Sequence, residues 1–152
     1  MVTIREAVTA DLPAMGRILE EMTAEYAVFL PDVFQTGADL TPVPVETPDH
    51  IRFVAELDGA VVGFAFGMIQ PQPPYPVFRP RTVALLQELG MLSAHRDRGI
   101  GTLLIERFTQ WGRERGAEAM QLNVYAASPR AVAFYERHGF EPLGIRMTKP
   151  LV

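Results

Sequence analysis

The segment Arg96-Asp97-Arg98-Gly99-Ile100-Gly101 combines two arginines with two closely spaced glycines, between a predicted strand and a predicted helix. At such a turn, successive backbone N–H groups point toward one spot at the positive end of the helix dipole. Glycine lets the backbone approach a ligand closely, and arginine adds positive charge. The pattern therefore predicts a cradle for phosphate groups. The alternative is a glycine-rich helix entry with solvated arginines.

Other ligand and catalytic motifs do not fit the sequence. A P-loop needs Gly-Lys-Ser/Thr, and the dinucleotide pattern needs a glycine at position 104, but residues 101–104 are Gly-Thr-Leu-Leu. A Gly-x-Ser-x-Gly nucleophile motif is absent, which argues against a serine hydrolase. The three histidines lack metal-ligand spacing and the chain has no cysteine, so we expect no metal and no disulfide framework.

Hydrophobic periodicity predicts the elements that position the glycine-rich segment. The first helix is expected to follow Thr9 and to end before Pro31, and two later helices cover 99–115 and 129–138. Strands are expected at residues 2–7, 51–57, 60–69, 83–92, 119–125 and 140–148. The order β-α-β-β-β-α-β-α-β is typical of a mixed α/β sheet. At 152 residues the chain fits a single domain.

Two segments resemble the motifs of one family, the Gcn5-related N-acetyltransferases (GNAT). Arg-x-x-Gly-x-Gly at 96–101 is similar to the family's acetyl-CoA pyrophosphate motif. Residues 128–140 resemble its Asn-x-x-Ala-x-x-Phe-Tyr-Glu-x-x-Gly-Phe segment, with Ser128 where asparagine is common. The resemblance implies one GNAT-like domain over residues 1–152. It also implies a mixed, mostly antiparallel central sheet that is flanked by helices and splayed at the cofactor site, near Val124.

The same resemblance implies a set of residues that bind acetyl-CoA. Backbone groups at the end of the central strand would bind the pantetheine and the acyl carbonyl, and the glycine-rich segment would bind the pyrophosphate. Gly90 would suit a bulge in that strand. The cofactor-binding residues expected on this basis are Met91, Leu92, Ser93, Arg96, Asp97, Arg98, Gly99, Ile100, Gly101, Thr102, Ser128 and Arg130.

Tyr135 and Glu88 are the candidate catalytic residues. Acyl transfer from a thioester expels a thiolate, which the phenol of Tyr135 can protonate. The alternative for Tyr135 is packing of its ring on the helix. An amine acceptor must lose a proton before attack, and Glu88 can accept it directly or through water. The alternative for Glu88 is a structural or substrate-anchoring role.

Charge is divided unevenly along the chain. The net charge is −4, which disfavours nucleic acid and anionic membranes as partners. Residues 1–50 hold two arginines and nine acidic residues, whereas residues 51–152 hold twelve basic and nine acidic residues. Because family acceptor sites use the first helices, we expect a small cationic amine that binds Glu21, Glu25 and Asp32. A solvated acidic face is the alternative.

The sequence leaves two further expectations. Residues 70–82 contain five prolines and are expected to wall the acceptor site, to form a homodimer contact, or to act only as an exposed connection. The N-terminus lacks an apolar signal region and no apolar run spans a bilayer, so we expect a cytoplasmic protein. The sequence therefore predicts an acetyl-CoA-dependent N-acetyltransferase that works by direct attack in a ternary complex. The alternatives are a CoA-binding module without transfer activity and a transferase of longer acyl groups.

Overall fold

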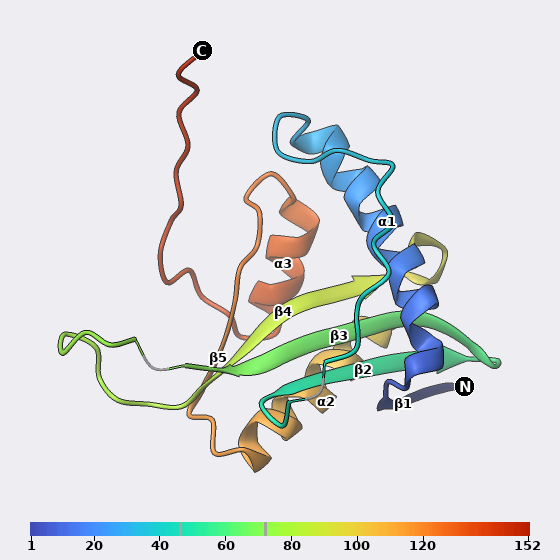
Figure 1. Ribbon diagram of the computed structural model, residues 1–152, viewed down its shortest axis with the longest axis horizontal. Coiled ribbons are helices and arrows are strands. Elements are labelled where there is room, and N and C mark those ends of the chain that lie inside the picture. Colours follow the sequence, from blue (N-terminus) through green and yellow to red (C-terminus); the bar gives the residue numbers. More distant parts are fainter. Residues whose placement is uncertain (46, 72) are drawn as a thin grey trace.

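The structure is a computed structural model that describes residues 1–45, 47–71 and 73–152. Glu46, one of the acidic residues counted above, and Gln72, in the proline-rich segment, lie outside the described residues. A five-stranded sheet with the order β1-β2-β3-β4-β5 forms the centre of the molecule (Figure 1). Neighbouring strands are antiparallel except for the parallel pair β4–β5. The strands are β1 (Val2–Glu6), β2 (His50–Leu57), β3 (Ala60–Gln70), β4 (Val83–Met91) and β5 (Ala119–Leu122).

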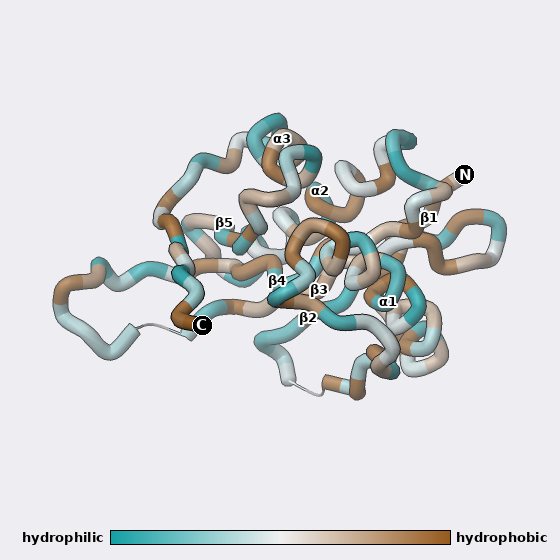
Figure 2. The backbone as a smooth tube through the Cα atoms, turned by 90° about the horizontal axis from the view of Figure 1, so that it is seen from above, coloured by the Kyte–Doolittle hydropathy of each residue, from teal (hydrophilic) through white to brown (hydrophobic). Residues whose placement is uncertain are grey.

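Helices cover both faces of this sheet. The helix α1 lies on one face, and α2 and α3 lie on the other (Figure 2). The helices are α1 (Leu12–Phe29), α2 (Ile100–Glu114) and α3 (Pro129–Arg137), with short 3-10 turns η1 (Thr9–Asp11) and η2 (Ser93–His95). The mixed, mostly antiparallel sheet flanked by helices is thus confirmed.

Strand alternation divides the core between the two faces. Phe53 points toward α2, whereas its neighbour Val54 points toward α1, where Phe64 of β3 joins it. Residues on both faces of β2 and β3 are therefore buried in the core.

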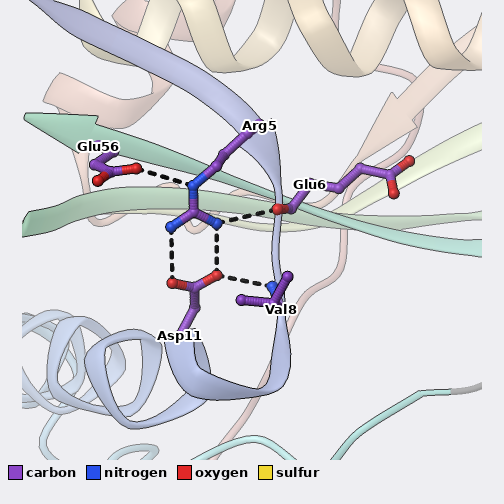
Figure 3. Close-up of polar contacts among 5 residues, drawn as sticks. All are labelled: Arg5, Glu6, Val8, Asp11 and Glu56. Atoms are coloured by element: carbon purple, nitrogen blue, oxygen red, sulfur yellow. Dashed lines mark hydrogen bonds and ion pairs between the residues drawn. The ribbon is translucent and has the colours of Figure 1, made fainter. Parts of the chain in front are cut away.

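A charged cluster holds the start of α1 against the sheet (Figure 3). Arg5 of β1 makes two hydrogen bonds to the buried carboxylate of Asp11, at 2.8 and 3.0 Å, and a third to Glu56 of β2 at 2.9 Å. The carboxylate of Asp11 also accepts a bond from the Val8 N–H at 2.7 Å. Because the guanidinium bonds hold its ionised form, the pKa of Asp11 is lowered despite burial. This cluster fixes where α1 begins.

The strand β4 contains a bulge, at a different position from the one expected. The β3–β4 register passes from Phe66–Glu88 to Gly67–Leu86, so Gln87 is the extra residue. The strand is bulged, but the expected position of the bulge, Gly90, is wrong. Gly90 instead gives α1 room, because a Cβ there would come within 2.9 Å of the Ile18 side chain.

The strand β5 is shorter than expected and leaves β4 partly unpaired. The parallel pairing runs from Val83–Ala119 to Leu86–Leu122 and stops there, although the sequence predicts a strand to residue 125. The remaining residues of β4, up to Met91, have no strand on that side in the described chain. The two strands therefore diverge, as the resemblance predicts.

The strand expected at residues 140–148 is not formed. The chain leaves α3 and extends away from the sheet to a free C-terminal end (Figure 1). Residues 141–152 are all exposed. A strand is stable only when it pairs with a neighbour, and within one copy of the chain this segment pairs with none of the described strands.

Candidate active site

The glycine-rich segment forms the entry to α2, as expected. Asp97 and Gly99 have φ angles of 62° and 78°, which turn the chain sharply before the helix. Leu103 donates the first helical bond, to the Gly99 carbonyl at 3.2 Å. The N–H groups of Ile100, Gly101 and Thr102 therefore open toward the helix N-terminus, where they can receive an anion.

Gly101 has a packing role beside its expected one. A Cβ at this position would meet the Phe134 ring of α3 at 3.0 Å and the Met91 side chain at 3.9 Å. Glycine thus lets α3 lie close to α2. The helices are also joined by a 3.2 Å contact between Thr102 Oγ1 and His138 Nε2.

Two arginines around the cradle, Arg96 and Arg130, are engaged within the protein. Arg96 donates to both carboxylate oxygens of Glu25, at 2.6 and 2.7 Å, so α1 supplies a carboxylate to the cradle. Arg130 of α3 pairs with Asp97 at 3.2 Å on an exposed surface. Ser128 is the N-cap residue of α3, but its side chain makes no capping hydrogen bond.

The gap between β4 and β5 exposes a backbone donor. The N–H of Leu92 points to β3, where it donates to the Val62 carbonyl at 2.9 Å. Successive residues of a strand point their N–H groups to opposite edges, so the N–H of Met91 faces the gap. The N–H of Ser93 donates to Glu21 at 2.6 Å, and the bonds from Ser93 lower the pKa of Glu21. Of the three backbone donors expected here, Met91 is the one that the fold directs into the gap.

Tyr135 lies on α3 in a mostly apolar setting. Its ring contacts those of Phe134 and Phe140, with centroids 5.4 and 5.8 Å away. Burial raises the pKa of Tyr135 to about 12, and Tyr26 of α1 contributes to the shift. No hydrogen bond to its hydroxyl is formed within the described residues. The phenol is therefore protonated at neutral pH and has a proton to donate.

An aromatic cluster that the sequence did not reveal lies on the α1 side. Tyr26, Phe34 and Tyr125 have ring centroids 5.2–5.5 Å apart and come from α1, from the loop after it and from the segment after β5. Because Tyr26 influences the pKa of Tyr135, the cluster lies near the candidate acid. The spacing of these residues in the sequence does not predict this cluster, because their contact depends on the order of the strands in the sheet.

Glu88 faces a cavity beneath α1. The bulge at Gln87 causes this, because unbroken alternation would place Glu88 on the same face as Ala84 and Leu86, toward α2. The cavity measures about 240 Å³ and its lining includes Met15, Phe66 and Arg52. Burial raises the pKa of Glu88, and Arg52 partly opposes the shift. A carboxylate with a raised pKa is suited to accept a proton from an amine.

The three acidic residues expected to bind the substrate are not gathered in one pocket. Glu21 holds the Ser93 N–H and Glu25 holds Arg96, so both lie at the cofactor side of α1. Asp32 is exposed in the turn after α1. A second cavity of about 300 Å³, between α1 and the following loop, is lined by Glu20 and Thr36 among others.

The proline-rich loop lies apart from the cavities described above. Residues 73–82 of the proline-rich segment form a loop that projects beyond the sheet (Figure 1), with Tyr75, Val77 and Phe78 exposed. Among the described residues, no cluster of three or more acidic or histidine side chains is arranged to hold a metal ion. In the same part of the chain, no helix is long and apolar enough to cross a bilayer.

The fold and these motifs define a class of acetyltransferases. The model of the acetyltransferase (GNAT) family matches residues 16–140, and the chain belongs to this family. A mutant of the BH1408 protein of Bacillus halodurans has a similar structure, with a TM-score of 0.91, 23% identity and 99% of each chain covered. The aminoglycoside N-acetyltransferase AAC(6')-Iy, solved with CoA, matches with a TM-score of 0.73, 17% identity, and coverage of 99% of this chain and 94% of that one.

One sequence relative matches over a shorter stretch. The uncharacterized N-acetyltransferase YdgE of Bacillus subtilis is 33% identical over 72 residues. That alignment covers 47% of this chain and 46% of YdgE, so the chain spans less than half of this relative.

Proposed function

We propose that this protein transfers an acetyl group from acetyl-CoA to a small amine by direct attack in a ternary complex. The observation that carries the proposal is the divergence of β4 and β5 after Leu86–Leu122. It leaves the Met91 N–H facing a gap that has the α2 N-terminus at one end and Tyr135 nearby on α3.

The residues around the gap fit acetyl-CoA. The N–H groups at the start of α2 would bind the pyrophosphate, with Arg98 and Arg96 as its charge partners. The diverging strands would admit the pantetheine arm between them, as a pseudo-strand beside β4. Support comes from the similar structure of AAC(6')-Iy, which was solved with CoA. When bound, acetyl-CoA supplies an acetyl group activated as a thioester.

The chain's own groups would then handle the protons and the developing charge. Glu88 accepts a proton from the ammonium form of the acceptor, directly or through water, which frees the nitrogen lone pair. The amine nitrogen forms a bond to the acyl carbon while the Met91 N–H stabilises negative charge on its oxygen. The C–S bond breaks, Tyr135 donates its proton toward the leaving thiolate, and the second proton of the nitrogen passes through water to the phenol.

The raised pKa of Tyr135 defines how it acts. A free thiol has a pKa of about 8.5, so complete proton transfer from a phenol with a pKa of about 12 to a thiolate is unfavourable. Tyr135 therefore donates a strong hydrogen bond to sulfur as the C–S bond breaks. Its proton is transferred completely only as the proton released by the amine nitrogen reaches the phenol through water, so no free phenolate is left behind.

The acceptor is proposed to arrive as a cation, because amines have pKa values near 10. Glu88 is the acidic side chain that lines the cavity beneath α1, whereas Glu21 and Glu25 are engaged by Ser93 and Arg96. Those two residues are better explained as a link between α1 and the cofactor loop than as acceptor ligands.

A screen of amines with acetyl-CoA tests the proposal, with free CoA and the acetylated product both measured. Tyr135→Phe keeps the ring and should lower kcat by roughly 10²–10⁴-fold with little change in acetyl-CoA affinity. Tyr125→Phe is the matched control, because it removes a phenol from the neighbouring aromatic cluster. Binding of acetyl-CoA without transfer to any amine would replace the proposal with a CoA-binding module.

A further inference from the structure

Two opposite charges face the cavity beneath α1. Arg52, Phe66 and Glu88 lie opposite one another on the neighbouring strands β2, β3 and β4 and form one row across the sheet. Arg52 and Glu88 both line the cavity of about 240 Å³. No ion pair or hydrogen bond joins these two residues, which are both in the described part of the chain.

The geometry explains why the charges stay apart. Neighbouring strands are about 4.8 Å apart, and Phe66 occupies the position between the two residues. The guanidinium of Arg52 lies over the Phe66 ring, 4.6 Å from its centroid, and donates one bond to the Val43 carbonyl at 2.8 Å. Its position is therefore fixed from two sides, and a guanidinium has further N–H groups to offer.

From this row we infer that the acceptor is a small zwitterion, an amino acid whose amine lies at Glu88 and whose carboxylate lies at Arg52. The inference rests on the proposed function and names its substrate class. A planar guanidinium matches a carboxylate, and a site with one charge of each sign suits a molecule with one of each. An acceptor with a second positive charge in place of the carboxylate would be repelled by Arg52. The apolar lining of Met15, Leu19 and Phe64 suits the carbon skeleton.

Matched pairs of acceptors test this inference: leucine against 3-methylbutylamine, phenylalanine against 2-phenylethylamine, and lysine against cadaverine. The members of each pair differ by the carboxylate alone. The inference predicts that in at least one pair the amino acid has a kcat/KM about 10- to 100-fold above that of its decarboxylated partner. Arg52→Gln should remove this preference by lowering the rate with the amino acid alone, and Arg52→Lys should restore part of it.

Arg113→Gln, on the exposed side of α2, is the control for loss of a positive charge. Decarboxylated amines that match or exceed their amino acids in the wild-type protein would overturn the inference and leave the acetyltransferase function intact. Absence of transfer to all six acceptors while other amines react would also overturn it. The failure of the proposed function has a different signature, acetyl-CoA binding without transfer to any amine.

Discussion

Replacement of Glu88 by glutamine separates its role in proton transfer from its place in the fold. The bulge at Gln87 turns this side chain into the cavity beneath α1, where glutamine has nearly the same shape but cannot accept the proton. General base catalysis contributes roughly 10²–10⁴-fold, and the lower end applies because water can share the task. We therefore expect Glu88→Gln to lower kcat/KM about 10²-fold at pH 7.

The pH dependence gives this prediction its sharpest test. An amine with a pKa near 10 has about 240-fold more of its free base at pH 9.5 than at pH 7. The variant should therefore recover most of its lost activity by pH 9.5, whereas the wild-type rate should rise less. The acid limb of the wild-type profile should lie above the usual range of a glutamate, because burial raises the pKa of Glu88.

The fold should tolerate the change. A carboxyl group whose pKa is raised in the folded state binds its proton more tightly there than in the unfolded chain. Its contribution to stability is therefore lost as the pH rises through that raised pKa. The neutral variant should unfold at the same temperature as the wild-type protein or a higher one at pH 7, in calorimetry. Glu106→Gln, exposed on α2, is the matched control. Equal activity of Glu88→Gln and wild type across this pH range would refute the role of Glu88 as the base.

The remaining predictions concern the cofactor loop and the charged cluster of Figure 3. Glu25→Gln frees Arg96 from its part-exposed ion pair. The variant should therefore bind CoA about 2- to 5-fold more tightly than the wild-type protein at low ionic strength, as measured by calorimetry. Weaker binding would mean that Glu25 holds Arg96 in its productive position. Asp11→Ala removes two hydrogen bonds to Arg5 and should lower the free energy of unfolding by about 2–3 kcal/mol in urea titrations. A loss below about 0.5 kcal/mol would show that the ion pair is dispensable. The lowered pKa of Asp11 adds stability that is lost as the pH falls through its folded-state value, so the difference between wild type and Asp11→Ala should shrink in acid.

The sequence predicted the elements that have a strong local signal. Helical spacing, Pro13 and Pro129 in first turns and the Gly99 turn located the three helices within a few residues. The hairpin at Asp58-Gly59 joined β2 and β3 as expected, with both residues at positive φ. The glycine-rich segment was placed correctly because its motif is local.

Features that depend on strand pairing could not be predicted. The bulge at Gln87 leaves no mark in the alternation of β4, yet it determines the face on which Glu88 lies. The face of the sheet on which Arg52 lies follows from its spacing of two residues from Val54. Its place in one row with Glu88 can be known only from the register of β2, β3 and β4. The strand expected at residues 140–148 has the right pattern, but the chain extends away from the sheet after α3 and pairs with none of the described strands.

The central claim, direct transfer in a ternary complex, is tested by mass spectrometry of the intact protein and of its small-molecule products. The protein incubated with acetyl-CoA alone should keep its unmodified mass, and addition of a reactive amine should give the acetylated amine and one free CoA per turnover. Tyr135→Phe should bind acetyl-CoA as well as the wild-type protein does and form this product far more slowly. A covalently acetylated protein that passes its acetyl group to the amine, or undiminished turnover by Tyr135→Phe, would contradict the account.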